Sequence, residues 1–362
     1  MDYANLVGDF KYLLLNLRWL QWRKCLGQST ITNFHLKNLV ILDLSNNSYL
    51  KDDWEDWSQI KVSFLTYFHL LYFFVFLFSR HRLLNWFFFF FFCNYFLVLQ
   101  KLKVLNLSRC NGLTRTPDFS TFTTLEILIL GMCPNLVEID PSIWKLKNLR
   151  VLDISTAGSC LATAITKSPD DIGNLEKLEE INASHCFHLQ EPPSSIGRLS
   201  SLRILRLDTT GICSLPTSIC GLSRLQTLDL YQCHQLQSLP ELPPSLTSLR
   251  ITCRSMWTYR SLSNLINLKE LCFDVCVNLV EIPRDIGKLS KLETLTLSNC
   301  NSLVQIPTDI GKLSILETLY LRGTKISTLP AEIGDLSLLK QVSNLNYMAA
   351  TIFNVSWGFP QV

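Results

Sequence analysis

One pattern of apolar residues recurs from end to end of this chain, and it limits the possible folds more than any other feature. The last copy runs through Leu316, Leu319 and Leu321 to the pair Leu329-Pro330. The copies before it repeat the same residue types at the same offsets, with central residues 21 to 24 positions apart in the last five intervals. A period of this length predicts one supersecondary unit per copy, each stacked on its neighbours.

Each copy contains a Leu-x-Leu segment, which predicts a short strand with two leucines pointing inward and the residue between them pointing outward. No copy can bury its apolar face alone, so we expect one parallel sheet above a continuous core. The expected central residues are Leu20, Leu42, Leu105, Leu128, Leu152, Ile181, Leu205, Leu228, Leu249, Leu271, Leu295 and Leu319. The predicted fold class is an α/β solenoid, a leucine-rich-repeat horseshoe with a parallel sheet on the concave face and irregular or short helical convex segments.

The pattern also predicts a domain organisation. N-terminal repeats occupy 1–60, an apolar insertion 61–100, the main solenoid 101–342 and a non-repeat tail 343–362. The insertion contains six consecutive phenylalanines at 87–92, and joining Lys61 directly to Lys101 restores the repeat frame. We interpret it as a translated intron. The alternatives are a transmembrane hairpin, because each apolar run approaches the length of a membrane span, and a genuine hydrophobic loop.

Thirteen cysteines are present, and six of them occupy one repeat position, three residues after the second strand leucine. These are Cys110, Cys133, Cys186, Cys233, Cys276 and Cys300. Because Asn47, Thr210 and Thr324 fill the same position elsewhere, we predict small hydrogen-bonding side chains there and reduced, structural thiols. With no signal peptide at the first residues, the expected location is cytoplasmic, with the nucleus as a second compartment. A membrane location depends on residues 62–99.

The charge and the motifs argue against catalysis and against nucleic acid. A net charge of +3 gives no strong field, so we expect no nucleic-acid partner. The tightest ligand cluster, His185-Cys186-Phe187-His188, includes the structural cysteine position, and no phosphate-binding loop motif occurs. We therefore predict that the chain is not an enzyme and has no catalytic residues, cofactor or metal.

Function in such a scaffold is expected on the concave face, at outward positions that the repeat does not dictate. Aromatic and arginine side chains contribute most to protein interfaces. The predicted protein-binding residues are Arg206, Asp208, Asp229, Tyr231, Arg250, Tyr320 and Arg322.

Further markers carry a family resemblance. They are the cysteine or threonine position, the Leu-Pro or Ile-Pro pairs such as Leu215-Pro216 and Ile306-Pro307, the Ile-Gly pairs that follow, and the opening Leu17-Arg-Trp19-Leu20. Over about 1–60 and 101–340 the chain resembles the repeat region of plant intracellular disease-resistance proteins. The class is the one that carries a Toll/interleukin-receptor domain and a nucleotide-binding switch. Neither domain occurs here, so we expect a fragment.

The resemblance implies a protein-recognition module in plant defence. Its partner would be a pathogen effector, a host guardee or a nucleotide-binding switch domain, held on the concave face. The alternative is a general intracellular leucine-rich-repeat signalling scaffold of the Ras-pathway type, which has similar Leu-Pro and Ile-Gly repeats.

Overall fold

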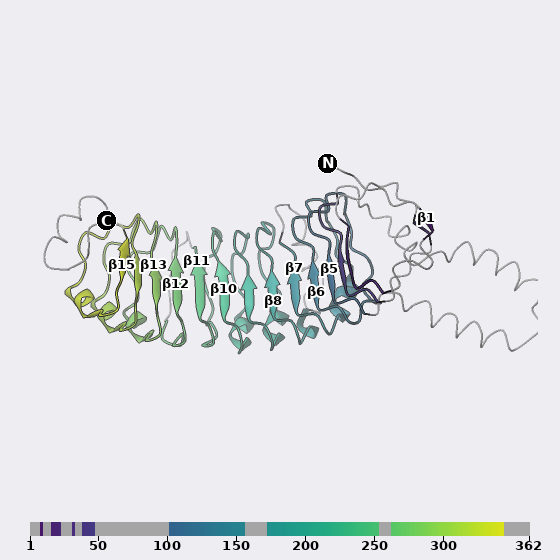
Figure 1. Ribbon diagram of the computed structural model, residues 1–362. Coiled ribbons are helices and arrows are strands. Elements are labelled where there is room, and N and C mark those ends of the chain that lie inside the picture. The colour runs from purple at the N-terminus through teal and green to yellow at the C-terminus, as the bar shows by residue number, and fades with distance from the viewer. Residues whose placement is uncertain are drawn as a thin grey trace, which may run out of the picture. The chain divides into compact units, whose positions relative to one another are not determined.

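The computed structural model describes residues 8–9, 16–22, 31–32, 38–47, 101–155, 172–252 and 262–343 (Figure 1). The chain divides into two compact units, unit 1 at residues 1–164 and unit 2 at residues 165–362. The apolar insertion and nearly all of the tail predicted after 342 lie outside the described residues, so the predicted domain boundaries stay predictions.

Unit 1 contains a parallel sheet whose strands follow one another in chain order. The strands are β2 (Trp19–Gln21), β4 (Ile41–Asp43), β5 (Val104–Asn106), β6 (Ile127–Ile129) and β7 (Val151–Asp153). Their expected central residues pair in one register, Leu20 with Leu42 and so on to Leu152. A separate two-stranded parallel pair, β1 (Gly8–Asp9) with β3 (Ile31–Thr32), is not indicated by the repeat pattern.

Strands β4 and β5 are direct neighbours although residues 44–103 separate them in the sequence. Ile41 pairs with Val104, and Asp43 pairs with Asn106. This register is the one expected when the repeat frame is read across the insertion. The two strands therefore behave as successive copies of the repeat.

Unit 2 continues the same plan (Figure 1). Its strands are β8 (Glu180–Asn182), β9 (Ile204–Arg206), β10 (Thr227–Leu230), β11 (Ser248–Ile251), β12 (Glu270–Phe273), β13 (Thr294–Thr296), β14 (Thr318–Tyr320) and β15 (Gln341–Ser343). All the central residues predicted for this unit pair in register. Strand β15 was not predicted; its Val342 pairs with Leu319 and adds one further copy.

The core of each unit is the column of stacked leucines. Leu105 and Leu107 of one copy are both buried while Asn106 between them is partly exposed, and this alternation recurs along the sheets. The return side of several coils carries a short 3-10 helix. These are η1 (Pro141–Lys145) in unit 1, and η2 (Ile172–Asn174), η3 (Ser194–Arg198), η4 (Thr217–Gly221), η5 (Arg284–Lys288), η6 (Thr308–Lys312) and η7 (Ala331–Asp335) in unit 2.

The proline and isoleucine of the repeated Pro-x-x-Ile-Gly segments explain where these helices form. Pro307 has a φ of −68° and directly precedes η6, which suits a ring that fixes φ near this value. Ile310 is fully buried, and its carbonyl accepts a hydrogen bond of 3.1 Å from the Leu313 amide, which ends the turn. Helices in the described residues are too short and not apolar enough to cross a membrane.

The cysteine position lies in the turn that follows each strand. The Cys133 thiol donates to the Leu107 carbonyl of the preceding coil over 3.1 Å, and the Cys110 thiol donates to the Leu44 carbonyl over 3.3 Å. Asn47, in the same position, donates to the Leu44 and Trp22 carbonyls. The predicted role of these residues as donors to turn backbone is confirmed. Burial raises the pKa of Cys110 to about 12, so its thiol stays neutral.

Candidate functional site

The outward side chains of β10 to β14 surround a shallow pocket in the sheet face of unit 2, with a volume of about 760 Å³. Four of the predicted binding residues line it, namely Tyr231, Arg250, Tyr320 and Arg322. They come from coils that are distant in sequence, and the parallel register brings them onto one face. The other predicted residues, Arg206, Asp208 and Asp229, do not line the pocket.

Arg250 is held in place by its neighbours at one side of the pocket. Its guanidinium lies 2.9 Å from the Asp229 carboxylate and 4.8 Å from the centre of the Tyr231 ring, so it combines an ion pair with a cation–π contact. Asp229 is mostly buried, and burial raises the pKa of its carboxyl, although the Tyr231 amide and the charge of Arg250 act in the opposite direction. Asp229 therefore positions Arg250 and does not face a ligand.

Cys272 also lines the pocket, and its thiol contacts the Arg250 side chain. Burial raises the pKa of the Cys272 thiol to about 11, against the lowering effect of the Arg250 guanidinium. A thiol with this pKa is almost entirely protonated at neutral pH, and the thiolate is the reactive form. Cys272 is therefore suited to packing against a ligand and poorly suited to nucleophilic attack.

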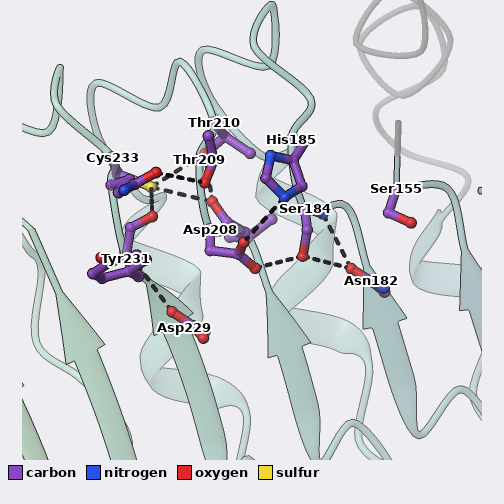
Figure 2. Close-up of polar contacts among 12 residues, drawn as sticks. Ser155, Asn182, Ser184, His185, Asp208, Thr209, Thr210, Asp229, Tyr231 and Cys233 are labelled. Atoms are coloured by element: carbon purple, nitrogen blue, oxygen red, sulfur yellow. Dashed lines mark hydrogen bonds and ion pairs between the residues drawn. The ribbon is translucent and has the colours of Figure 1, made fainter. Parts of the chain in front are cut away.

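The polar residues at the ends of β8 and β9 form a cluster that is satisfied internally (Figure 2). The Ser184 hydroxyl contacts Asn182 Oδ1 at 2.7 Å and also the Asp208 carboxylate, while His185 Nε2 lies 4.0 Å from Asp208 Oδ2. Ser184 and His185 are thus both directed at Asp208 and not at each other, which is not the arrangement that activates a serine. The Asp208 carboxylate is therefore already bonded to residues of this cluster.

Arg206 is occupied in the same way, because its guanidinium forms an ion pair with Glu180 of the neighbouring strand. The register places Arg206 opposite Asn182, so its side chain reaches back along β8 to Glu180, which lies two residues earlier on the same face. Among the described residues, no group of three or more His, Cys, Asp or Glu side chains is arranged to hold a metal ion.

The structure adds lining residues that the sequence reasoning missed. Glu270 and Thr294 each precede a central leucine by one position, and Asn299 lies in the turn after β13. Side chains on both sides of an inward residue point to the same face of a strand. Strand alternation is therefore the sequence signal for Glu270 and Thr294, because it places them on the same face as the residues that follow the central leucines.

Unit 1 presents a different sheet face. The residues that directly precede its central leucines are all apolar and lie in adjacent positions of the register. They are Trp19, Ile41, Val104, Ile127 and Val151. Trp19 is 61% exposed, and the others are partly buried. The position before the central leucine is therefore apolar in unit 1, whereas Glu270 and Thr294 occupy it at the pocket of unit 2.

Comparisons with known proteins support the repeat assignment. A profile of Zer-1-like leucine-rich repeats matches residues 94–168, and a leucine-rich-repeat profile matches residues 291–313. Disease resistance protein RML1A of Arabidopsis thaliana is 35% identical over 109 residues, which are 30% of this chain and 10% of that protein. Disease resistance protein RPS4B of the same plant is 33% identical over 108 residues, 30% of this chain and 8% of that protein. The chain thus matches a tenth or less of the length of these relatives.

Solved structures agree on the fold. A leucine-rich-repeat protein of Leptospira interrogans has a TM-score of 0.54 at 20% identity, covering 85% of this chain and 73% of that one. The functional domain of InlJ from Listeria monocytogenes, which includes a cysteine ladder, has a TM-score of 0.50 at 18% identity and covers 91% and 64% of the two chains. At these identities the likeness concerns the fold alone. This chain is therefore a solenoid of leucine-rich repeats.

Proposed function

We propose that this chain is a protein-recognition module of a plant defence response, and that it binds its partner on the sheet face of unit 2. The observation that carries the proposal is the gathering of two arginines and two tyrosines, Tyr231, Arg250, Tyr320 and Arg322, around one pocket. These residue types dominate the binding energy of protein interfaces. A solenoid supplies an extended face on which such side chains can meet a large partner.

The partial similarity to RML1A and RPS4B supports the defence role. It favours a pathogen effector, a host guardee or a nucleotide-binding switch domain as the partner, and a cytoplasmic location. On this proposal the chain acts by binding and is not an enzyme. The predicted residues Arg206, Asp208 and Asp229 act indirectly, since each is paired with a neighbouring side chain.

The proposal can be tested with the switch domain as the named partner. The full chain would be co-expressed in leaf tissue with the part of RML1A that precedes its repeats, and the amount that co-purifies would be measured. We expect the combined replacement of Tyr231, Arg250, Tyr320 and Arg322 by alanine to reduce recovery at least tenfold. A matched control replaces Lys288 and Asp335, exposed residues of η5 and η7, and should leave recovery unchanged.

A parallel screen against a panel of pathogen effectors covers the other partner class. The proposal fails if neither the switch domain nor any effector binds, or if binding survives the four substitutions. A partner with no part in immunity, bound through the same four residues, would instead favour the general signalling scaffold.

A further inference from the structure

Side chains at the cysteine position of adjacent coils reach one another. In the coils of β9 and β10, Thr210 Oγ1 and Cys233 Sγ lie 3.3 Å apart (Figure 2). In the coils of β12 and β13 the same position holds two cysteines, and the thiol of Cys300 is hydrogen-bonded to that of Cys276. Two sulfur atoms from successive turns of the solenoid are thus in direct contact.

The placement of these two residues suits a disulfide. Cys276 and Cys300 are 24 residues apart, the same offset that separates the paired central residues Leu271 and Leu295. They therefore occupy equivalent places in neighbouring coils, and adjacent strands of a sheet lie about 4.8 Å apart. A disulfide requires Cα atoms roughly 4.4 to 6.8 Å apart and side chains directed at each other. The coil spacing falls within this range, and the contact between the thiols meets the second condition.

The bonds from these two thiols to the backbone are long. Cys276 Sγ lies 3.7 Å from the Ile251 carbonyl oxygen, and Cys300 Sγ lies 3.6 Å from the Phe273 carbonyl oxygen. A thiol is a weak donor even at a shorter distance. Conversion of the pair into a disulfide would therefore sacrifice little hydrogen bonding.

A second pair of adjacent cysteines, Cys110 and Cys133 in the coils of β5 and β6, is held differently. Their thiols donate to the Leu44 and Leu107 carbonyls over the shorter distances of 3.3 and 3.1 Å. Burial raises the pKa of both thiols, that of Cys110 to about 12. At Cys300 the hydrogen bond with Cys276 lowers the pKa of the thiol in spite of its burial. Because the thiolate is the reactive form, Cys300 is the more easily activated residue.

We propose that Cys276 and Cys300 form an oxidation site, at which hydrogen peroxide converts the contacting thiols into a disulfide that links the coils of β12 and β13. The two side chains are only 2% and 0% exposed, so the oxidant must be small, which favours peroxide over a bulky disulfide reagent. The bridge would join two coils that line the pocket through Asp274 and Ser298. The inference does not depend on the proposed function, because it concerns the chemistry of the coils and not the partner of the face.

The reaction balances in two steps. The Cys300 thiolate attacks one oxygen of the peroxide, the O–O bond breaks, and the departing hydroxide takes up the proton that the Cys300 thiol released, giving water and a sulfenic acid. The Cys276 sulfur then attacks the Cys300 sulfur, so that the S–S bond forms as the S–O bond breaks. The leaving hydroxide takes the Cys276 proton and departs as a second water. Two thiols are oxidised, and one peroxide is reduced to two waters.

The test treats the reduced full chain with hydrogen peroxide, blocks the remaining thiols with iodoacetamide after denaturation, and digests with trypsin for mass spectrometry without reduction. We expect peptides 270–284 and 292–312 to be joined, with the loss of two hydrogens. Cys272 lies in the same peptide as Cys276, so fragment ions between them assign the bridge. The yield should be roughly tenfold higher than for a bridge between Cys110 and Cys133, the matched control, because their thiolates are scarcer. Dithiothreitol should restore both thiols.

The variants Cys276→Thr and Cys300→Thr separate the two steps. Threonine suits the position, because the Thr210 and Thr324 hydroxyls donate to strand carbonyls at 2.6 and 2.9 Å, and circular dichroism verifies that each variant is folded. Neither variant should form the bridge. In Cys276→Thr the Cys300 sulfenic acid should persist and be labelled by dimedone, whereas Cys276 in Cys300→Thr should be labelled several-fold less.

The exposed thiol of Cys220 reports that the oxidant has acted. Oxidised Cys220 without a Cys276–Cys300 bridge overturns the inference, and so does a bridge that involves Cys272 instead of Cys276. Equal yields for the two cysteine pairs would show that the contact between Cys276 and Cys300 has no effect on reactivity, which also overturns it. A link found only in dimers on a non-reducing gel would reject a bridge within one chain. Equal dimedone labelling in the two variants would reject Cys300 as the attacking residue.

Discussion

At the scale of single residues, nine of the described turns after strands impose a left-handed backbone on the residue that precedes the cysteine position. Arg109, Thr209 and Val275 all have φ between +55° and +57° there. The conformation aims the amide at the next coil; the Thr209 N–H donates to the Tyr231 carbonyl over 2.6 Å. The path of the solenoid thus overrides the steric preference of the side chain, since φ above zero is unfavourable for most residues.

The left-handed backbone should reduce stability clearly at Val275, because a β-branched side chain is a genuine outlier at its φ of +55°. Val275→Asn is expected to stabilise the protein by about 1 kcal/mol, since asparagine tolerates the left-handed region. Urea unfolding followed by circular dichroism would show a higher midpoint at an unchanged slope. Val277→Asn, two residues away without positive φ, is the control and should give no gain. An unchanged midpoint for Val275→Asn would show that the turn carries no such strain.

At the scale of elements, the spacing of coils depends on glycines in the 3-10 helices. A Cβ on Gly197 of η3 would lie 2.3 Å from the Ser218 carbonyl oxygen of η4, while a Cβ on Gly221 of η4 would meet nothing closer than the Gly197 carbonyl oxygen at 3.2 Å. The difference arises because the coil after η4 passes through Leu242-Pro243-Pro244 and forms no 3-10 helix there. A 3-10 helix that is covered by the helix of the next coil therefore requires glycine more strictly than a helix that no other helix covers.

Gly197→Ala should destabilise the protein by about 2–3 kcal/mol, the upper range for overpacking, although alanine normally favours a helix over glycine. Gly221→Ala should cost under about 1 kcal/mol, because its neighbour needs to move only slightly. The two variants form a matched pair for denaturant unfolding. Equal losses in the free energy of unfolding would mean that both positions require the backbone freedom of glycine. The close approach of η4 to Gly197 would then not be the cause.

The sequence predicted the elements well and the site only partly, for one physical reason. A central residue such as Leu295 is identified by spacing within its own copy, so local apolar periodicity is enough. Whether Arg206 is free or paired depends on Glu180, one coil away, and the state of Arg250 depends on Asp229 in the same manner. The left-handed turn at Val275 has no signal in its residue type. Contacts between coils, which the pattern within one copy does not contain, therefore determine whether these side chains are free or paired.

At the scale of the whole molecule, each coil packs against its immediate neighbours. A destabilising substitution should therefore loosen the coils next to it and leave distant coils unchanged. Leu295 is fully buried, and its truncation to alanine is expected to cost about 2–5 kcal/mol. Hydrogen exchange measured by mass spectrometry should then show lost amide protection in β12, β13 and β14, with β9 nearly unaffected. Leu128→Ala in unit 1 is the reciprocal variant. Uniform loss of protection across both units would contradict this picture.

The parallel register has a consequence for how such a gene can change. Because Leu295 pairs with Leu319 and both occupy equivalent places, a recombination event that duplicates or removes one whole period would leave every remaining partner correctly aligned. An error of one residue within a period would turn its leucines outward. Unequal crossing-over between copies can thus change the length of the sheet face without disturbing the fold. Substitutions at outward positions can change which partner that face binds.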